Sequence, residues 1–222
     1  MISRHLDRSM DKIKKMILEL SATVEQNVQM AVQAVSEHNS QMAQQVIDSD
    51  NDIDKLEVDI EEECLHILAL HQPVAIDLRF VVSVLKINND LERIGDESVN
   101  IAERAQYLAN HPVLEIPFDF TIMLAKTKQM LQRSLDSLMN MDAELAHQVG
   151  TQDDEIDELN RQMYAYVQES IRAQPEHVVA LIHLLSVSRH LERIADYATN
   201  IAEDVVYMIE GEIIRHKPEN FG

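Results

Sequence analysis

Two segments of the chain carry the same pair of carboxylates at a spacing that places both on one side of a helix. Side chains at i and i+4 lie about 5–6 Å apart at their Cβ atoms, where like charges repel. A bound cation would turn that repulsion into attraction, so this spacing indicates a metal site. The paired carboxylates are Glu92 with Asp96, and Glu192 with Asp196.

The repeat copies more than these pairs. The run Leu91-Glu92-Arg93-Ile94-Gly95-Asp96 with Asn100-Ile101-Ala102-Glu103 recurs one hundred residues later as Leu191-Glu192-Arg193-Ile194-Ala195-Asp196 with Asn200-Ile201-Ala202-Glu203. A second echo repeats Asp50, Ile53, Asp54 and Leu56 as Asp153, Ile156, Asp157 and Leu159. Such self-similarity indicates a tandem duplication. We therefore expect secondary ligands from both copies: Asp54, Asn100, Glu103, Asp157, Asn200 and Glu203.

The ligand types narrow the choice of metal. Oxygen donors without cysteine and with little histidine suit hard cations such as magnesium, calcium, manganese or oxidised iron, while zinc usually prefers nitrogen and sulfur. The competing interpretation is a solvated acidic face, balanced locally by Arg93 and Arg193. Retention of the same polar residues in both copies favours a site. The motif Glu63-Cys64-Leu65-His66 has no copy in the second half and is interpreted as structural.

Long helices must position these residues. Four glycines, five prolines, no tryptophan and 45% hydrophobic residues predict an all-α protein. Apolar residues at three and four spacing predict six helices, and short links make neighbouring helices antiparallel. The expected fold is two antiparallel three-helix bundles, residues 1–112 and 113–222. The predicted helices cover about 6–37, 40–71, 74–109, 120–139, 142–173 and 176–210.

Charge and composition exclude several classes of function. Nineteen basic and thirty-nine acidic residues give a net charge of −20, which disfavours direct binding to nucleic acid or to anionic membranes. With so few glycines there is no glycine-rich phosphate loop. Cys64, the single cysteine, lies on an apolar stripe and is expected to be a core residue. No apolar run reaches about 18 residues, so we expect a soluble, cytoplasmic protein.

The doubled Glu-Arg-Ile-Gly/Ala-Asp motif, together with Asp77-Leu78-Arg79 and Asn89-Asp90, resembles the PhoU family of bacterial phosphate-signalling proteins. The resemblance covers nearly the whole chain. It implies a cytoplasmic negative regulator of the phosphate-starvation response that also modulates high-affinity phosphate uptake. The implied partners are the ATPase subunit of a phosphate ABC transporter and a membrane sensor histidine kinase. It also implies divalent or trivalent metal ions, multinuclear iron among them, on Glu92, Asp96, Glu192 and Asp196.

The function expected from these observations is a non-enzymatic, metal-binding adaptor that reaches the membrane only peripherally, through its partners. The alternative is a carboxylate-bridged metalloenzyme or metal-storage protein, and a third reading is a metal-free helical scaffold. A homodimer is a further expectation. Two departures from the duplication concern the family motifs: Asp77-Leu78-Arg79 has no copy in the second half, and Ala195 replaces Gly95.

Overall fold

The computed structural model describes residues 2–111, 118 and 120–212. Within these residues every regular element is helical, which confirms the all-α prediction. The predicted boundary between residues 112 and 113 lies outside the described residues, so the two domain ranges stay a prediction. The elements are α1 (Ile2–Glu37), α2 (Ser40–His71), α3 (Ala75–Ala109), α4 (Phe120–Asn140), α5 (Ala143–Gly150), α6 (Asp153–Ala173), the short 3-10 turn η1 (Pro175–His177) and α7 (Val178–Glu210).

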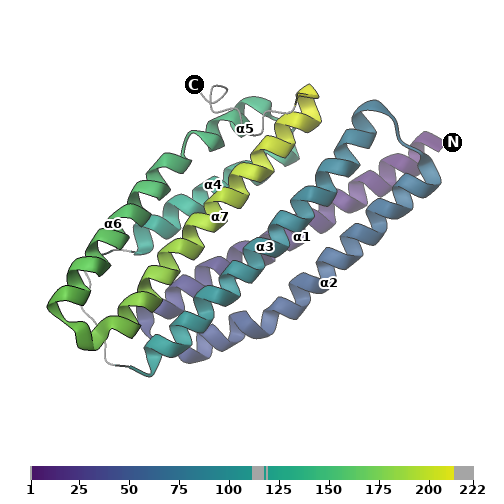
Figure 1. Cartoon of the computed structure of the whole chain (residues 1–222). Helices are drawn as coiled ribbons and strands as arrows, with labels where there is room; N and C mark the ends of the chain where they lie inside the picture. Colours follow the sequence, from purple (N-terminus) through teal and green to yellow (C-terminus); the bar gives the residue numbers. More distant parts are fainter. Residues whose placement is uncertain (1, 112–117, 119, 213–222) are drawn as a thin grey trace.

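The two repeats meet along α3 and α7, which lie side by side in the centre of the molecule (Figure 1). Helix α2 flanks α3 on one side, α6 flanks α7 on the other, and α1 and α4 pack behind them. Helices α3 and α7 run antiparallel, since Ser83 contacts Asp204 whereas Glu97 contacts His190. Each carboxylate motif is therefore shared between a central helix, α3 or α7, and an outer helix, α2 or α6.

The predicted apolar seams form the core. In α2 the seven-residue series Val46, Ile53, Ile60 and Ile67 is at most 1% exposed. Because such a series stays on one face of a helix, the carboxylates beside it are held at the edge of the buried stripe. The eight seam positions predicted for α3 are all buried: Val84, Ile87, Leu91, Ile94, Ser98, Ile101, Ala105 and Leu108.

Capping residues fix two of the turns. The Asn39 side chain accepts a hydrogen bond from the backbone N–H of Met42 at the start of α2. Asp142 does the same for Leu145 at the start of α5. Both satisfy backbone donors that the first turn of a helix leaves without a partner. The predicted turns at residues 38–40 and 140–142 are thus confirmed.

The single helix predicted over residues 142–173 is wrong, because it is broken into α5 and α6. Helix α5 ends at Gly150, where Thr151 Oγ1 donates to the Gln148 carbonyl and the Gln152 N–H bonds the Val149 carbonyl at 3.0 Å. A new helix then begins with Asp153, Asp154 and Glu155 in its first turn, where acidic side chains are favourable. The break places Asp153 at the start of α6.

The last helix begins at Val178 rather than at Glu176. Its predicted first turn is the separate turn η1, with Pro175 at its start. No helix within the described residues is long and apolar enough to cross a membrane.

Gly95 of α3 packs closely against Ile53 of α2. A Cβ at this position would lie 3.1 Å from Ile53 Cδ1 and 3.2 Å from its Cγ2. We expect Gly95→Ala to destabilise the protein by about 1 kcal/mol, because overpacking against buried Ile53 exceeds the gain in helix propensity. The measurement is urea unfolding. A more stable variant would show that Ile53 moves freely.

Candidate functional site

The first carboxylate face joins side chains from α2 and α3. We define it as Asp50, Asp54 and Glu57 of α2 with Glu92 and Asp96 of α3. Four of these five carboxyls have raised pKa values. Their negative charges act on one another across the two helices, so the α2 side chains converge on the predicted ligands of α3.

Burial is the main cause of each shift in the first face. It raises the pKa of Asp50, with further contributions from Asp54 and Asp96. Burial and the charge of Asp96 raise the pKa of Glu92, and Arg93 partly offsets them. The pKa of Asp96 is raised by burial and by Asp54 against the opposing charge of Arg93. The pKa of Glu57 also rises, through burial and then Glu61. Nearby positive charge therefore does not offset the cost of burying ionised carboxylates in this face.

The second carboxylate face repeats this arrangement on α6 and α7. It consists of Asp153 and Asp157 of α6 with Glu192 and Asp196 of α7. Burial, followed by the charge of Asp157, raises the pKa of Asp153 to about 6. Burial, followed by the charge of Asp153, raises the pKa of Asp196 to about 6. The break before α6 thus brings Asp153 into the electrostatic environment of the α7 motif.

The two faces differ at one position. Where the first face has Glu57, the second has Asn160, whose Nδ2 donates to Glu192 Oε2 at 3.0 Å. The Asn160 Oδ1 in turn accepts from Ser188 at 2.8 Å. In the first face the amide comes from the other helix of the pair: Asn88 of α3 donates to the backbone carbonyl of Glu57 in α2 at 2.9 Å. Glu192 is therefore oriented by a neutral amide, while Glu92 lies beside another carboxylate.

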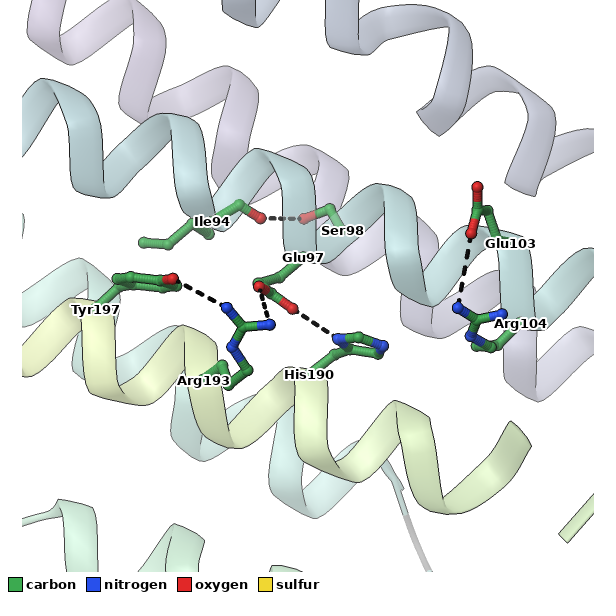
Figure 2. Close-up of polar contacts among 8 residues, drawn as sticks. All are labelled: Ile94, Glu97, Ser98, Glu103, Arg104, His190, Arg193 and Tyr197. Carbon is green, nitrogen blue, oxygen red and sulfur yellow. Dashed lines mark hydrogen bonds and ion pairs between the residues drawn. The ribbon is translucent and has the colours of Figure 1, made fainter. Parts of the chain in front are cut away.

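Only two of the six predicted secondary ligands lie in the carboxylate faces. Asp54 and Asp157 belong to the faces, as their effects on neighbouring pKa values show. Glu103 is exposed and lies 3.7 Å from Arg104 on its own helix (Figure 2). Asn100, Asn200 and Glu203 are half-buried farther along α3 and α7, and their role as ligands stays a prediction.

The donor set of the two faces fits a hard cation. Crowded carboxylates with raised pKa values are what a divalent or trivalent ion would neutralise. In the part of the chain that the structure describes, no group of three or more His, Cys, Asp or Glu side chains is already arranged to hold a metal ion. Binding would therefore require some carboxylates to rotate, and the set Glu92, Asp96, Glu192 and Asp196 stays a prediction.

Sequence reasoning missed a buried ionic cluster between the repeats. Glu97 of α3 is 2% exposed, and its carboxylate accepts from His190 Nδ1 at 2.6 Å and from Arg193 Nη1 at 2.9 Å (Figure 2). Arg193 also donates to the Tyr197 hydroxyl at 3.3 Å. The arginine of the second motif thus binds the other repeat, whereas Arg93 lies only 3.8 Å from its neighbour Glu92. The one signal for this cluster in the sequence is the position of Glu97, three residues after the buried seam residue Ile94, where a helix places a side chain beside the buried stripe.

Two further contacts fasten α3 to α7. Lys86 pairs with Asp204 at 3.1 Å, and Asp204 is 1% exposed. Arg79 Nε donates to the Met208 carbonyl at 3.0 Å, close to the end of α7. The arginine of the unrepeated Asp77-Leu78-Arg79 triplet therefore caps a helix of the other repeat.

The interpretation of the Glu63–His66 motif as structural agrees with the geometry. Glu63 pairs with Lys12 of α1, and His66 is exposed. Cys64 is buried, and burial raises its thiol pKa to about 12. A thiol in this state is unreactive, so Cys64 is a core residue as predicted.

The sequence of both repeats matches the model of a known family. The PhoU domain model matches residues 17–105 and again residues 120–205. The chain belongs to the PhoU family. Each match covers one repeat and contains one carboxylate motif, so the duplication seen in the sequence is a pair of PhoU domains.

Relatives support the assignment along almost the full chain. The PhoU homolog of Aquifex aeolicus, named a phosphate-specific transport system accessory protein, is 39% identical over 212 residues, 96% of each chain. The crystal structure of PhoU from Pseudomonas aeruginosa has a TM-score of 0.88 at 33% identity, covering 93% of this chain and 99% of that one. A structure from Streptococcus pneumoniae, titled a phosphate transport system regulatory protein, has a TM-score of 0.83 at 30% identity, covering 94% of this chain and 98% of that one. These names describe accessory and regulatory proteins rather than enzymes, so the metalloenzyme alternative is set aside.

Proposed function

We propose that this PhoU protein is a cytoplasmic, metal-binding adaptor of phosphate-specific transport. Its partners are the ATPase subunit of a phosphate ABC transporter and a membrane sensor histidine kinase, and it modulates phosphate uptake and lowers starvation signalling. The relatives' names support the link to phosphate transport. The shared fold over nearly the whole chain supports a common architecture for that role.

The observation that carries the metal-binding part is the raised pKa of the carboxyls in both faces. Asp153 and Asp196 each have a pKa of about 6, although the ordinary value for an aspartate is 3.8. At neutral pH these groups are ionised at a cost in folding free energy. A protein that retains such a cost in both repeats has a use for the charge, and cation binding is the use that best fits the donor atoms.

Metal occupancy would control docking through surface charge. Each face joins an outer helix, α2 or α6, to a central helix, α3 or α7 (Figure 1). Its carboxylates are half-buried or exposed, so a partner has access to them. A cation neutralises the face and presents a positive centre to acidic groups of a partner. Electrostatic complementarity of this kind sets association rate and partner choice more than raw affinity. The metal occupancy of the faces would therefore determine whether the protein binds the transporter or the kinase.

Elemental analysis of the purified protein tests the metal site. We expect at least one equivalent of a hard metal ion in wild type after purification without chelator or affinity-tag metal. The variant Glu92→Gln, Asp96→Asn, Glu192→Gln and Asp196→Asn should keep its helicity and lose the metal. Trace metal in both proteins would contradict the proposal.

A pulldown of the transporter ATPase then separates docking from metal binding. We expect the quadruple variant to capture less ATPase than wild type, and wild type stripped with chelator to behave like the variant. Capture that is the same for all three samples would leave the adaptor role but reject metal control. No capture by wild type would reject the adaptor role itself.

A further inference from the structure

The first carboxylate face continues by one helical turn toward the start of α3. Asn88 precedes Glu92 by four residues, as Glu92 precedes Asp96, so the three side chains lie on one side of the helix. Glu57 of α2 lies opposite them. Its charge acts on Glu92, and Asn88 Nδ2 lies 2.9 Å from its backbone carbonyl oxygen and 3.4 Å from its Oε1. We call Glu57, Asn88 and Glu92 the Asn88 group.

Asn88 carries a buried oxygen that the chain leaves without a donor. The residue is 1% exposed, and its side-chain Oδ1 has no hydrogen-bond partner among the residues that the structure describes. Turning the amide over does not help, because Nδ2 donates to the Glu57 carbonyl and an oxygen in its place would meet another acceptor. A buried acceptor without a donor costs about 1–3 kcal/mol. Oδ1 therefore needs a partner from outside the chain.

The same position in the second face is closed by hydrogen bonds. Ser188 stands where the first repeat has Asn88, and Asn160 stands where it has Glu57. Ser188 donates to Asn160 Oδ1 at 2.8 Å, and Asn160 Nδ2 donates to Glu192 Oε2 at 3.0 Å. The Asn160 amide thus has a partner at both ends, whereas within the described chain the Asn88 amide is bound only through its nitrogen.

Water is the usual partner of a buried carbonyl oxygen, but it fits the Asn88 group poorly. Asn88 Oδ1 and the carboxylates of Glu57 and Glu92 are all acceptors, and a water molecule has hydrogens for only two of them. Within the described residues, the two carboxylates have one ion pair, Glu92 with Arg93 at 3.8 Å. A cation would bind all three acceptors and offset both charges.

We propose that the Asn88 group binds a divalent hard cation through Asn88 Oδ1, Glu57 and Glu92, and that the second repeat lacks this site. Carboxylate and amide oxygens without nitrogen or sulfur suit magnesium, calcium or manganese. The inference rests on the proposed metal binding of the carboxylate faces. It deepens that proposal, because it adds a ligand set to one face and makes the two faces unequal.

Small side-chain rotations are sufficient to form the site. Oxygens that share one such cation lie at most about 5 Å apart, because each is about 2.3–2.6 Å from the ion. Oδ1 and Nδ2 of Asn88 belong to one planar amide, and Nδ2 is already 3.4 Å from Glu57 Oε1. Glu92 is 27% exposed, so its carboxylate is free to turn toward Glu57. Asn88 itself needs no movement.

Unequal faces would give the protein a graded response to cations. The first face fills at a lower cation concentration than the second, because it has more oxygen ligands. Empty, half-occupied and fully occupied proteins then differ in surface charge. Since surface charge affects association rate and partner choice, the half-occupied protein is a distinct binding state.

Manganese titration followed by electron paramagnetic resonance tests the site, because the signal of free manganese measures how much is bound. Each face is titrated separately in the full chain. Glu192→Gln with Asp196→Asn leaves the first face, and Glu92→Gln with Asp96→Asn leaves the second. We expect the first face to bind manganese about tenfold more tightly or better, since losing even a supporting group of a metal site costs about 10–100-fold in affinity.

Substitutions within the Asn88 group test its ligands. In the protein that retains only the first face, Glu57→Gln and Asn88→Ser should each weaken manganese binding about tenfold or more. Glu57→Gln keeps the shape of a half-buried side chain, so it remains informative if Asn88→Ser does not fold. Circular dichroism in chelator checks folding. The matched control is Glu61→Gln, which removes the same charge from an exposed position one turn further along α2 and should leave binding unchanged.

The outcomes separate this inference from the metal-binding proposal. Absence of manganese binding to both faces would reject both. Equal affinity of the two faces, or equal losses in Glu57→Gln and Glu61→Gln, would overturn the Asn88 site and leave the carboxylate faces as metal sites. Unchanged binding in Glu57→Gln and Asn88→Ser would also overturn it and assign water to Asn88 Oδ1.

Discussion

Arg193→Ala is expected to lower the free energy of unfolding by about 2–3 kcal/mol, since it removes a partner from a buried carboxylate. Glu97 is 2% exposed and its two oxygens are bound by Arg193 and His190 of the other repeat. Without the guanidinium, one oxygen would keep its charge in a desolvated position with its partner lost. The measurement is urea unfolding followed by circular dichroism.

The duplication supplies the matched control. Arg93 occupies the same place in the first motif and is about as exposed as Arg193, but it lies 3.8 Å from Glu92, which is 27% exposed where Glu97 is 2% exposed. Exposed pairs of this kind contribute about 0–1 kcal/mol. Arg93→Ala should therefore change stability by no more than about 0.5 kcal/mol. Equal losses of unfolding free energy in Arg193→Ala and Arg93→Ala would show that the contact between repeats stabilises the protein no more than an exposed ion pair does.

A double variant separates the lost contact from the orphaned charge. Adding Glu97→Gln to Arg193→Ala removes the uncompensated carboxylate, so we expect about half of the lost stability to return. If the stability lost by the double variant equals the sum of the losses of the two single variants, the penalty does not come from a buried charge. The cluster would then act only through packing.

Local pattern was sufficient to predict the helices and their buried faces. The series through Ile53 and Ile60 in α2, and through Leu91 and Ile94 in α3, is buried where its spacing indicates. These positions depend on helix geometry alone, which relates residues three, four or seven apart. The cap at Asp142 is equally local. The carboxylate faces follow, because their residues border the same stripes.

The contacts between repeats could not be predicted in this way. Glu97 and His190 are 93 residues apart, and no periodicity states which face of α3 meets α7. Arg79 reaches Met208 across an even larger separation. The break after Gly150 was missed because the apolar spacing continues across it, through Val149 and Ile156. There the geometry is decided by backbone and side-chain hydrogen bonds of Gln148, Thr151 and Gln152.

Asp153→Asn with Asp196→Asn is expected to stabilise the metal-free protein at pH 7 by on the order of 2 kcal/mol. In the folded protein each carboxyl has a pKa of about 6 instead of the ordinary 3.8. The folded state thus holds its protons more tightly than the unfolded state. Because Asp196 is partly in solvent and the two groups interact, the gain is smaller than the sum of two full shifts.

The pH dependence follows from the direction of the shift. A raised carboxyl pKa stabilises the folded state below about pH 4, and this contribution is lost as pH rises through about 6. We expect wild type in chelator to lose stability from pH 4 to pH 7 relative to the double variant. Thermal unfolding at several pH values gives this difference directly.

A control variant of equal charge tests whether the effect is local. Asp52→Asn with Asp136→Asn removes two negative charges from exposed positions on α2 and α4. General relief of self-repulsion would stabilise both double variants alike. We expect the control to gain much less, because its carboxylates lie outside the second carboxylate face.

Added cation distinguishes a metal site from a merely crowded surface. At pH 7, magnesium or manganese should raise the unfolding temperature of wild type, since a ligand that binds only the folded state stabilises it by mass action. The Asp153→Asn and Asp196→Asn variant should respond much less. If both proteins respond equally, the ions act by general screening and the second carboxylate face is no binding site. A selective response would mean that the charge which destabilises the empty fold is the charge that binds the metal.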